Sequence, residues 1–256
     1  MLNFAIETAR EAGQILLEKF GRKIEISKKG KINLVTEADF ASEKLIIEKI
    51  RSRYPKHSIL AEESGESNAA VTSGENVWKW IIDPLDGTTN YAHGYPCFCV
   101  TIALEHQGEI VLGVTFDPTR DELFAAEKGQ GATLNNKKIS VSETSALSEA
   151  LIVTGFPYNF AEKDNFVDHL NDFLVHSRGV RRDGSAAIDM AYVACGRFDG
   201  FWEEGLNPWD VAAGVLLIEE AGGRISYYDN SPFSIYKAPI CASNDLIHSE
   251  MLEILK

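Results

Sequence analysis

Carboxylates stand where predicted helices or strands begin or end in several parts of this chain. The segment "IIDPLDGTTN" places Asp83 and Asp86 directly after the apolar run "VWKWII". Two carboxylates this close repel each other unless a cation lies between them. Loops at the ends of rigid elements are also where proteins commonly build sites. The segment is therefore either an ordinary polar turn or part of a metal site.

Three more carboxylates have similar positions: Asp39, Glu62 and Asp210. Divalent cations such as Mg²⁺ prefer oxygen ligands, so a few carboxylates and the carbonyl of Leu85 would suit them. Taken singly, each position has an ordinary explanation. Asp39 and Asp210 could cap helices, Glu62 could lie on a solvated face, and "DPLDG" could be a simple turn. The metal hypothesis depends on their joint occurrence.

The residues that follow Asp86 suit an anion. Gly87 lets the backbone turn sharply and approach a ligand, and free N–H groups at a helix start that includes Thr88 would bind a phosphate. Carboxylates for two metal ions beside such amides are what hydrolysis of a phosphate ester requires. No serine or cysteine has a His–Asp pattern nearby, so the sequence does not indicate a covalent nucleophile.

The composition is that of a globular protein. The chain has 256 residues, of which 45% are hydrophobic and 25% charged, which suits one large domain or two closely packed halves. Its net charge of −13 disfavours direct contact with nucleic acid, because that affinity depends on lysine and arginine. An acidic protein that acts on an anion needs cations in its site.

Cysteine usage and the first residues predict the compartment. The chain has four cysteines: Cys97, Cys99, Cys195 and Cys241. Their spacing predicts neither a disulfide framework nor a zinc site, so we expect free thiols in a reducing cytosol. Glu7 and Glu11 interrupt the region where a signal peptide would be apolar, and no apolar run is long enough to cross a bilayer. We expect a cytoplasmic protein.

Apolar periodicity predicts helices and strands in a mixed order. Helices are expected at 2–20, 36–53, 166–177, 186–196, 207–222 and 245–256. Strands are expected at 58–61, 77–83, in several segments of 98–141, and near 149–156, 198–204, 224–228 and 238–244. Thr36 and Asp39 match a capping box, and the strand before Glu62 could pair with the strand before Asp83. The order favours layers of helix and sheet over a doubly wound parallel fold.

The segments "AEES", "WIIDPLDGTTNY", "RRDGSAAIDMAYVACGRFDGFWE", "PWDVAAG" and "EEAGG" resemble the inositol monophosphatases of the lithium-sensitive, Mg²⁺-dependent phosphatase superfamily, in its bacterial branch. The resemblance covers nearly the whole chain. It implies an α+β fold, a layered αβαβα sandwich of the inositol monophosphatase / fructose-1,6-bisphosphatase type. It also implies a single phosphatase domain over 1–256, with the metal site in a half of about 1–145 and substrate-side residues in a half of about 146–256.

The resemblance also implies residue roles. Two or three Mg²⁺ ions would be held by Glu62, Asp83, the carbonyl of Leu85, Asp86 and Asp210. The catalytic residues would be Glu62 and Thr88, which position and activate the attacking water, with Asp39 paired to the threonine. Phosphate and polyol would be contacted by Asp86, Gly87, Thr88, Ala186, Glu203 and Asp210. Lys28 would lie in a mobile lysine-rich loop near a third metal ion.

The activity so implied is hydrolysis of myo-inositol 1-phosphate and similar small polyol phosphates by a metal-activated water, in a lithium-sensitive homodimer. Sister phosphatases acting on fructose 1,6-bisphosphate, histidinol phosphate or adenosine 3′,5′-bisphosphate are the alternative. A regulatory binding protein without turnover is a further alternative, which the complete set of carboxylates opposes. The family's serine contact to the polyol has no match near "VTGFPYN". Arg181 and Arg182 could face a second anion or a dimer partner, or be solvated.

Overall fold

The computed structural model describes residues 1–22, 26–29, 33–67, 77–156 and 165–256. The helices are α1 Leu2–Lys19, α2 Glu37–Arg53, α3 Thr88–Ala92, α4 Phe166–His176, α5 Ala186–Ala194, α6 Pro208–Glu220 and α7 His248–Leu255. The strands are β1 Ile26–Lys29, β2 Asn33–Thr36, β3 Ser58–Ala61, β4 Gly65–Ser67, β5 Trp78–Asp86, β6 Cys99–His106, β7 Glu109–Asp117, β8 Glu122–Glu127, β9 Gly131–Leu134, β10 Lys137–Lys138, β11 Leu151–Thr154, β12 Gly179–Arg181, β13 Gly200–Glu203, β14 Arg224–Ser226 and β15 Ile240–Ser243.

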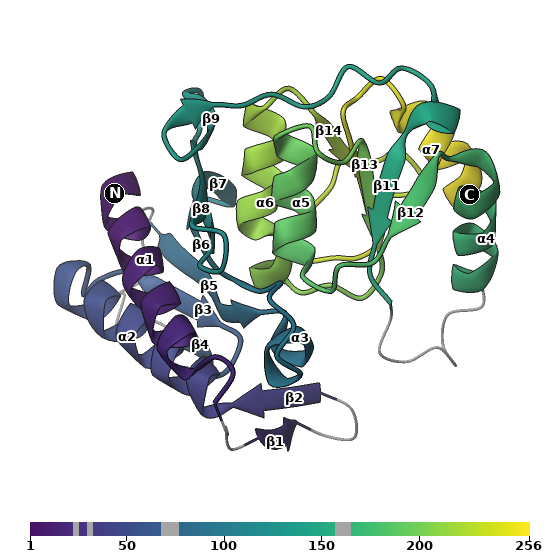
Figure 1. Cartoon of the computed structure of the whole chain (residues 1–256). Coiled ribbons are helices and arrows are strands. Elements are labelled where there is room, and N and C mark those ends of the chain that lie inside the picture. Colours follow the sequence, from purple (N-terminus) through teal and green to yellow (C-terminus); the bar gives the residue numbers. More distant parts are fainter. Residues whose placement is uncertain (23–25, 30–32, 68–76, 157–164) are drawn as a thin grey trace.

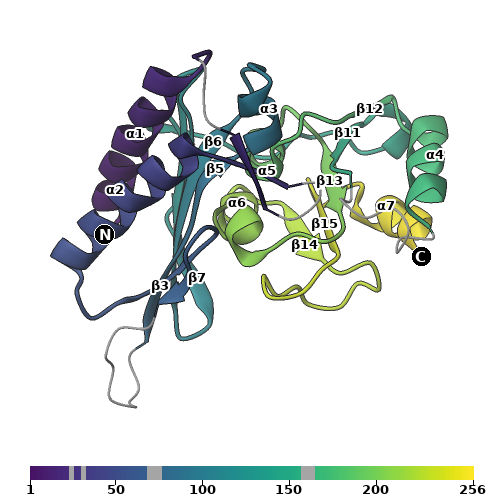
Figure 2. The same cartoon turned by 90° about the horizontal axis from the view of Figure 1, so that it is seen from below.

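These elements stack as five layers (Figures 1 and 2). Helices α1 and α2 cover one face of an eight-stranded sheet, and α5 and α6 lie between that sheet and a five-stranded sheet. Helices α4 and α7 cover the outer face of the smaller sheet. The predicted αβαβα layering is therefore confirmed. A helix layer enclosed by two sheets must be apolar nearly all round, and every residue of α5 is buried.

The larger sheet has the strand order β10-β9-β8-β7-β6-β5-β3-β4. Its neighbouring strands are antiparallel except for β3 and β5, which run parallel, with Ala61 opposite Ile82. Parallel strands end at the same edge of a sheet. Glu62, which directly follows β3, donates its backbone N–H to the Ile82 carbonyl at 3.3 Å. The predicted pairing of these strands is confirmed, and it brings Glu62 to the edge where Asp83 lies.

The smaller sheet has the order β12-β11-β13-β15-β14, and β11 runs parallel to both of its neighbours. Thr154 on β11 is opposite Trp202 on β13. The hydroxyl of Thr154 also donates to the Trp202 carbonyl at 2.7 Å, which fixes this register. The next residues, Gly155 after β11 and Glu203 at the end of β13, therefore lie side by side.

Close packing of α6 holds the middle layer against the larger sheet. A Cβ added to Gly113 on β7 would lie 2.8 Å from the Cα atom of Ala213 on α6. The sheet backbone thus meets the helix backbone directly, and any side chain at Gly113 would separate them. This close contact determines where α6 begins, and therefore where Asp210 in its first turn lies.

The helices and the apolar strands agree with the sequence-based predictions, but the short polar strands were missed. No strand was predicted for the paired segments β1 and β2, or for β4 with its sequence "GES". Strand β12, "GVR", was also not predicted. Such strands exist because a neighbouring strand pairs with them, not because of an alternating apolar pattern. The predicted caps of α2 are confirmed, since Thr36 and Asp39 form a capping box.

A buried histidine joins the smaller sheet to the last helix. His248 is fully buried at the start of α7. Its Nε2 atom is 2.9 Å from Oγ of Ser226 on β14, and its Nδ1 atom is 2.8 Å from Oγ of Ser243 on β15. Burial, with the nearby charge of Arg224, lowers the pKa of His248 to about 4, although Asp245 opposes the shift.

The first prediction concerns acid stability. Between its ordinary pKa of 6.5 and about 4, His248 is neutral in the folded chain and protonated in the unfolded chain. The stabilisation of the folded chain by neutral His248 is therefore complete above pH 6.5. As the pH falls toward 4, the free energy of unfolding decreases by about 1.4 kcal/mol per pH unit. Urea unfolding of wild type and His248→Gln should give free energies whose difference shrinks with acid. The exposed His93→Gln is the control, and a difference independent of pH would contradict the assignment.

Candidate active site

Four of the predicted carboxylates meet where β3, β5 and α6 converge. Asp83 is only 2% exposed near the end of β5. Burial raises the pKa of Asp83 well above its ordinary value, and the charges of Glu62, Asp86 and Asp210 raise it further. Charges perturb one another to this extent only at short range. The structure therefore brings together residues that are far apart along the chain.

Asp86 connects the larger sheet to the start of α5. Its Oδ2 atom accepts hydrogen bonds from Ser185 Oγ at 2.6 Å and from the Ala187 backbone N–H at 2.8 Å. Burial raises the pKa of Asp86, and these bonds, with the Ala186 and Gly87 amides, lower it. Ala186, predicted as a substrate contact, thus lies with its amide beside this carboxyl group.

Asp210 is held in the first turn of α6. The backbone N–H of Asn207 donates to Asp210 Oδ2 at 2.7 Å, which places the carboxylate at the positive end of the helix dipole. Burial and the charge of Asp86 raise the pKa of Asp210 to about 8. The side chain is surrounded by protein but keeps some exposure to solvent, as expected for a group that faces an open site.

Asp39 and Thr88 are in contact, as expected from the resemblance. Asp39 Oδ2 accepts from the N–H of Thr36 at 2.9 Å and from its hydroxyl at 2.6 Å. Thr88 Oγ1 is 3.3 Å from Asp39 Oδ1 and 3.0 Å from the carbonyl oxygen of Leu85. Burial raises the pKa of Asp39, although its hydrogen bonds oppose the shift. The Thr88 hydroxyl thus lies between two acceptors.

Gly87 has both the conformation and the space that only glycine fits. Its φ angle is +94°, a left-handed value that favours glycine. A Cβ atom there would also lie 2.8 Å from the Cys97 carbonyl oxygen. The five-residue helix α3 starts at the next residue, Thr88, and no side chain caps its first turn. The backbone amides of this turn lie beside the carboxylates.

Glu203 lies at the other side of the site, at the end of β13. It is partly exposed although protein surrounds it. Burial, followed by the charges of Asp210 and Asp86, raises the pKa of Glu203 to about 8, while Arg182 lowers it. The Arg182 guanidinium lies over the ring of Phe156, 4.9 Å from its centre. The effect of its charge on Glu203 places Arg182 near the site. The side chain of Arg181 instead donates to the Val180 carbonyl at 3.2 Å.

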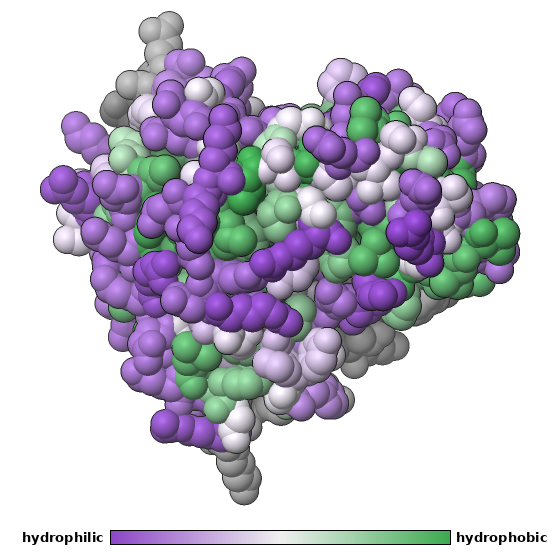
Figure 3. Space-filling model, turned by 45° about the horizontal axis from the view of Figure 1, so that its top comes forward, coloured by the Kyte–Doolittle hydropathy of each residue, from purple (hydrophilic) through white to green (hydrophobic). Residues whose placement is uncertain are grey.

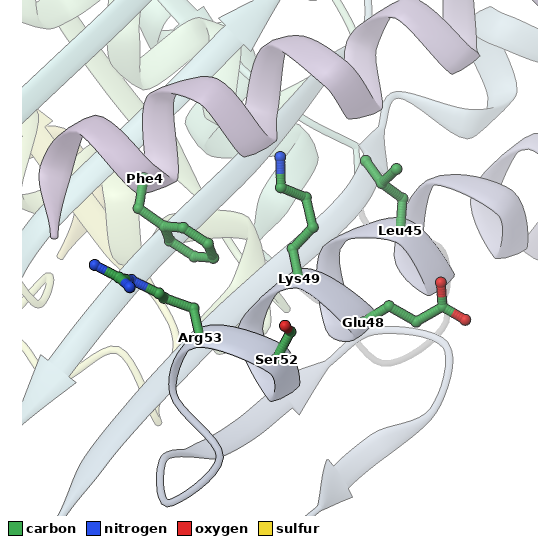
Figure 4. A pocket seen from close by; sticks show the side chains of 6 residues that line it. All are labelled: Phe4, Leu45, Glu48, Lys49, Ser52 and Arg53. Atoms are coloured by element: carbon green, nitrogen blue, oxygen red, sulfur yellow. The ribbon is translucent and has the colours of Figure 1, made fainter.

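The structure describes only part of the predicted Lys28 loop, and it has a pocket that the sequence did not predict. The backbone of Lys28 belongs to β1, while its side chain and the loop at 30–32 lie outside the described residues. The pocket in Figure 4, of about 360 Å³, is formed by α1 and the later turns of α2, and it is lined by Phe4, Leu45, Glu48, Lys49, Ser52 and Arg53. Asp39 precedes Lys49 by roughly 15 Å of helix, so this pocket is separate from the carboxylates.

Several residues of the site were not predicted. Ser185 and Cys99 both contact Asp86, with Cys99 Sγ 3.9 Å from Asp86 Oδ2. Asn90 Nδ2 donates to the carbonyls of Cys97 and Asp183, each at 2.8 Å, and so ties α3 to the segment before α5. A signal existed for Ser185, because serine directly before "AAID" is a typical helix N-cap. The sequence gives no signal for the other two.

The donor set suits a hard divalent cation. Asp83, Asp86, Asp210 and Glu62 offer only oxygen atoms, as Mg²⁺ prefers, and burial raises the pKa of all three aspartates, a cost that a bound cation would offset. In the described ranges, no three histidine, cysteine, aspartate or glutamate side chains already surround one point as metal ligands do. The chemistry of these oxygen donors fits the ion.

Comparisons with known proteins identify the family of this chain. The model of the inositol monophosphatase family matches residues 1–256. An inositol-1-monophosphatase from Synechocystis is 46% identical over 99% of this chain and 88% of its own length. The Nus factor SuhB of Pseudomonas aeruginosa is 42% identical over 100% of this chain and 96% of its own.

Solved structures are similar as well. The inositol monophosphatase from Anabaena has a TM-score of 0.88 and 47% identity, covering 99% of this chain and 94% of its own. An IMPase/NADP phosphatase complexed with Mg²⁺ and phosphate has a TM-score of 0.82 and 26% identity, covering 95% and 90%. The fold is therefore the α+β type of inositol monophosphatases and fructose-1,6-bisphosphatases, with two mixed sheets. The chain belongs to the inositol monophosphatase family.

The second prediction tests the junction between Asp86 and α5. Ser185→Ala removes the 2.6 Å bond to Asp86 and the bond that Ser185 accepts from the Ile188 N–H. Loss of a helix cap of this kind should lower the free energy of unfolding by about 1–2 kcal/mol, measured with urea. The exposed Ser249→Ala on α7 is the control and should change it by less than about 0.5 kcal/mol. Equal losses in the free energy of unfolding for Ser185→Ala and Ser249→Ala would contradict a stabilising role of Ser185 between Asp86 and α5.

Proposed function

We propose that this protein is a Mg²⁺-dependent phosphomonoesterase that hydrolyses myo-inositol 1-phosphate and related small polyol phosphates by attack of an activated water. The observation that carries the proposal is the convergence of buried Asp83 with the partly exposed Asp86 and Asp210 beside the first turn of α3. Carboxylates next to free amides can hold cations and a phosphate side by side. The inositol-1-monophosphatase named among the relatives supports the same activity.

Two or three Mg²⁺ ions would be held by Glu62, Asp83, Asp86, Asp210 and the Leu85 carbonyl. When bound, they supply charge for the phosphate oxygens and the leaving oxygen, and they lower the pKa of water. The chain itself provides fixed ligands. The Leu85 N–H bonds to Asp83 Oδ1 at 2.9 Å, and the Asn207 and Ser185 contacts orient the other two aspartates. Preorganised ligands avoid the cost of reorientation during the reaction.

Thr88 and Glu62 are proposed to aim the water. The Thr88 hydroxyl donates its only hydrogen to Asp39 or to the Leu85 carbonyl, so its oxygen lone pairs are available to accept a hydrogen bond from water. Asp39 thereby sets the orientation of the hydroxyl. Glu62 lies near Asp83 at the edge of the sheet and supplies a second acceptor. Together they would hold one water in a fixed direction.

Phosphate and alcohol would be contacted from opposite sides. The Gly87 and Thr88 amides would bind phosphate oxygens, and Glu203, with Asp86 and Asp210, would accept hydrogen bonds from hydroxyl groups. Ala186 would contact the alcohol beside them. A carboxylate acceptor such as Glu203 favours a polyol over an apolar alcohol. Fructose-1,6-bisphosphatase, histidinol phosphatase and adenosine 3′,5′-bisphosphate phosphatase activities remain the competing assignments.

We further propose a single phosphatase domain over 1–256, a cytoplasmic location and a homodimer. Four free cysteines suit a reducing compartment, and no helix in the described ranges is long and apolar enough to cross a membrane.

On the face in Figure 3, hydrophobic patches are separated by hydrophilic residues, so that face offers no large apolar interface. The net charge of −13 opposes direct contact with nucleic acid. A Nus-factor role, as named for the Pseudomonas relative, would then operate through proteins.

The third prediction concerns the substrate. Purified protein with Mg²⁺ should release phosphate from myo-inositol 1-phosphate with a higher kcat/KM than from fructose 1,6-bisphosphate, histidinol phosphate or adenosine 3′,5′-bisphosphate, because Glu203 suits hydroxyl groups. Inhibition by lithium is measured in the same assay. A higher kcat/KM for one of the other three esters would identify that ester, and not myo-inositol 1-phosphate, as the preferred substrate. No release of phosphate from any ester would overturn the enzymatic function.

The fourth prediction concerns the metal ligands. Asp83→Asn keeps the size of the side chain but removes one negative charge, so Mg²⁺ should bind more weakly and hydrolysis should fall to background. The fold should persist, because the change also relieves repulsion from Asp86 and Asp210. Thermal unfolding with and without Mg²⁺ should show a smaller stabilisation by the ion than in wild type. Glu219→Gln, in the last turn of α6, is the control. Full activity in Asp83→Asn would refute the role of Asp83.

A further inference from the structure

The Glu203 carboxyl group occupies the space that a side chain at Gly155 would need. A Cβ atom built on Gly155 would overlap the carboxyl carbon and both carboxyl oxygens of Glu203. The contact follows from the parallel register of β11 and β13, in which Thr154 is opposite Trp202. Gly155 and Glu203 come next on their strands, and Gly155 is buried. The carboxylate therefore lies across the end of β11.

The backbone does not explain the glycine. Gly155 is not among the glycines with a positive φ angle, so other residues could adopt its conformation. Gly87 differs, because its φ of +94° favours glycine regardless of space. At Gly155 the reason is the neighbouring carboxylate. A glycine that is required only because another group approaches its Cα closely indicates that the position of that group, here the Glu203 carboxylate, is important.

The ends of β11 and β13 are held together beside Glu203. Thr154 is tied to the Trp202 carbonyl at 2.7 Å, so the two strand ends cannot separate. Trp202 is fully buried and stacks on Phe173 with ring centres 5.3 Å apart. A methyl group at Gly155 would therefore displace the Glu203 side chain and leave the backbone in place.

We infer that Gly155 is a specificity-determining positioning residue: by lacking a side chain it lets the Glu203 carboxylate lie across the end of β11, where it accepts hydrogen bonds from the hydroxyls of the leaving polyol. The inference rests on the proposed function. It assigns to Gly155 the recognition of the alcohol and no part in the hydrolysis, since Gly155 follows β11 and the proposed phosphate amides lie at Gly87 and Thr88, at the start of α3.

The test compares two substrates in Gly155→Ala. For myo-inositol 1-phosphate, KM should rise about ten- to a hundredfold, as expected when hydroxyls lose a charged acceptor. For p-nitrophenyl phosphate, whose leaving group carries no free hydroxyl before cleavage, kcat/KM and the Mg²⁺ dependence should stay within about threefold of wild type. Equal losses for both substrates, or unchanged kinetics for both, would overturn the inference.

Gly200→Ala is the matched control. Gly200 lies on the same sheet, and a Cβ there would overlap the side chain of Met251, away from the carboxylates. This change should lower stability while leaving the ratio of kcat/KM between the two substrates as in wild type. A shift in that ratio equal to the shift in Gly155→Ala would assign the effect to general disturbance of the sheet, and would also overturn the inference.

Unfolding experiments decide the matter if Gly155→Ala is too unstable to assay. Urea unfolding of Gly155→Ala, Glu203→Ala and the double variant forms a cycle. Because the overlap is with the carboxyl group, the double variant should recover most of the stability lost in Gly155→Ala, and additive losses would overturn the inference. If wild type itself releases no phosphate from myo-inositol 1-phosphate, the proposed function fails, and the cycle still reports whether Gly155 makes room for Glu203.

Discussion

Mutual repulsion among buried carboxyl groups is the constraint on which this site depends. Burial raises the pKa of Asp83, Asp86 and Asp210, and neighbouring carboxylates raise the pKa of Asp83 and Asp210 further. Hydrogen bonds from backbone and hydroxyl groups reduce this cost without supplying a full positive charge. The proposed Mg²⁺ ions supply that charge. A chain with net charge −13 that processes phosphate esters therefore obtains its cations from solution.

Helix starts supply the local compensation. Asp39 and Asp210 lie in the first turns of α2 and α6, and Asp86 accepts bonds at the start of α5. Each helix N-terminus carries partial positive charge and unpaired N–H groups. The carboxylates are therefore directed by the ends of rigid helices, two of which lie between the sheets. Stacking of the layers, and especially the close contact of α6 with β7, fixes the spacing of the carboxylates.

Sequence patterns predicted what depends on local spacing. The helices, the long strands and the adjacency of Glu62 to the end of β5 all follow from periodicity and pairing rules. The bond between Ser185 and Asp86 could not be predicted in this way, because the stacking of two sheets brings those residues together. The sequence also gave no signal for Gly155, since the reason for a glycine there is the Glu203 carboxylate beside it and not a turn or a positive φ angle. The polar strand β4 depends on its neighbour, and a period-2 pattern of apolar residues does not reveal it.

The bond between Asp86 and Ser185 spans 99 positions along the chain. Helices and hairpins can form from nearby residues, but a contact of this separation requires a long loop to close, with its entropic cost. The hydrogen bonding of Asp86 is thus completed only when α5 has docked beside the larger sheet. Recovery of phosphatase activity during refolding would follow the recovery of helical signal, and it would report the docking of layers and not the formation of the individual elements.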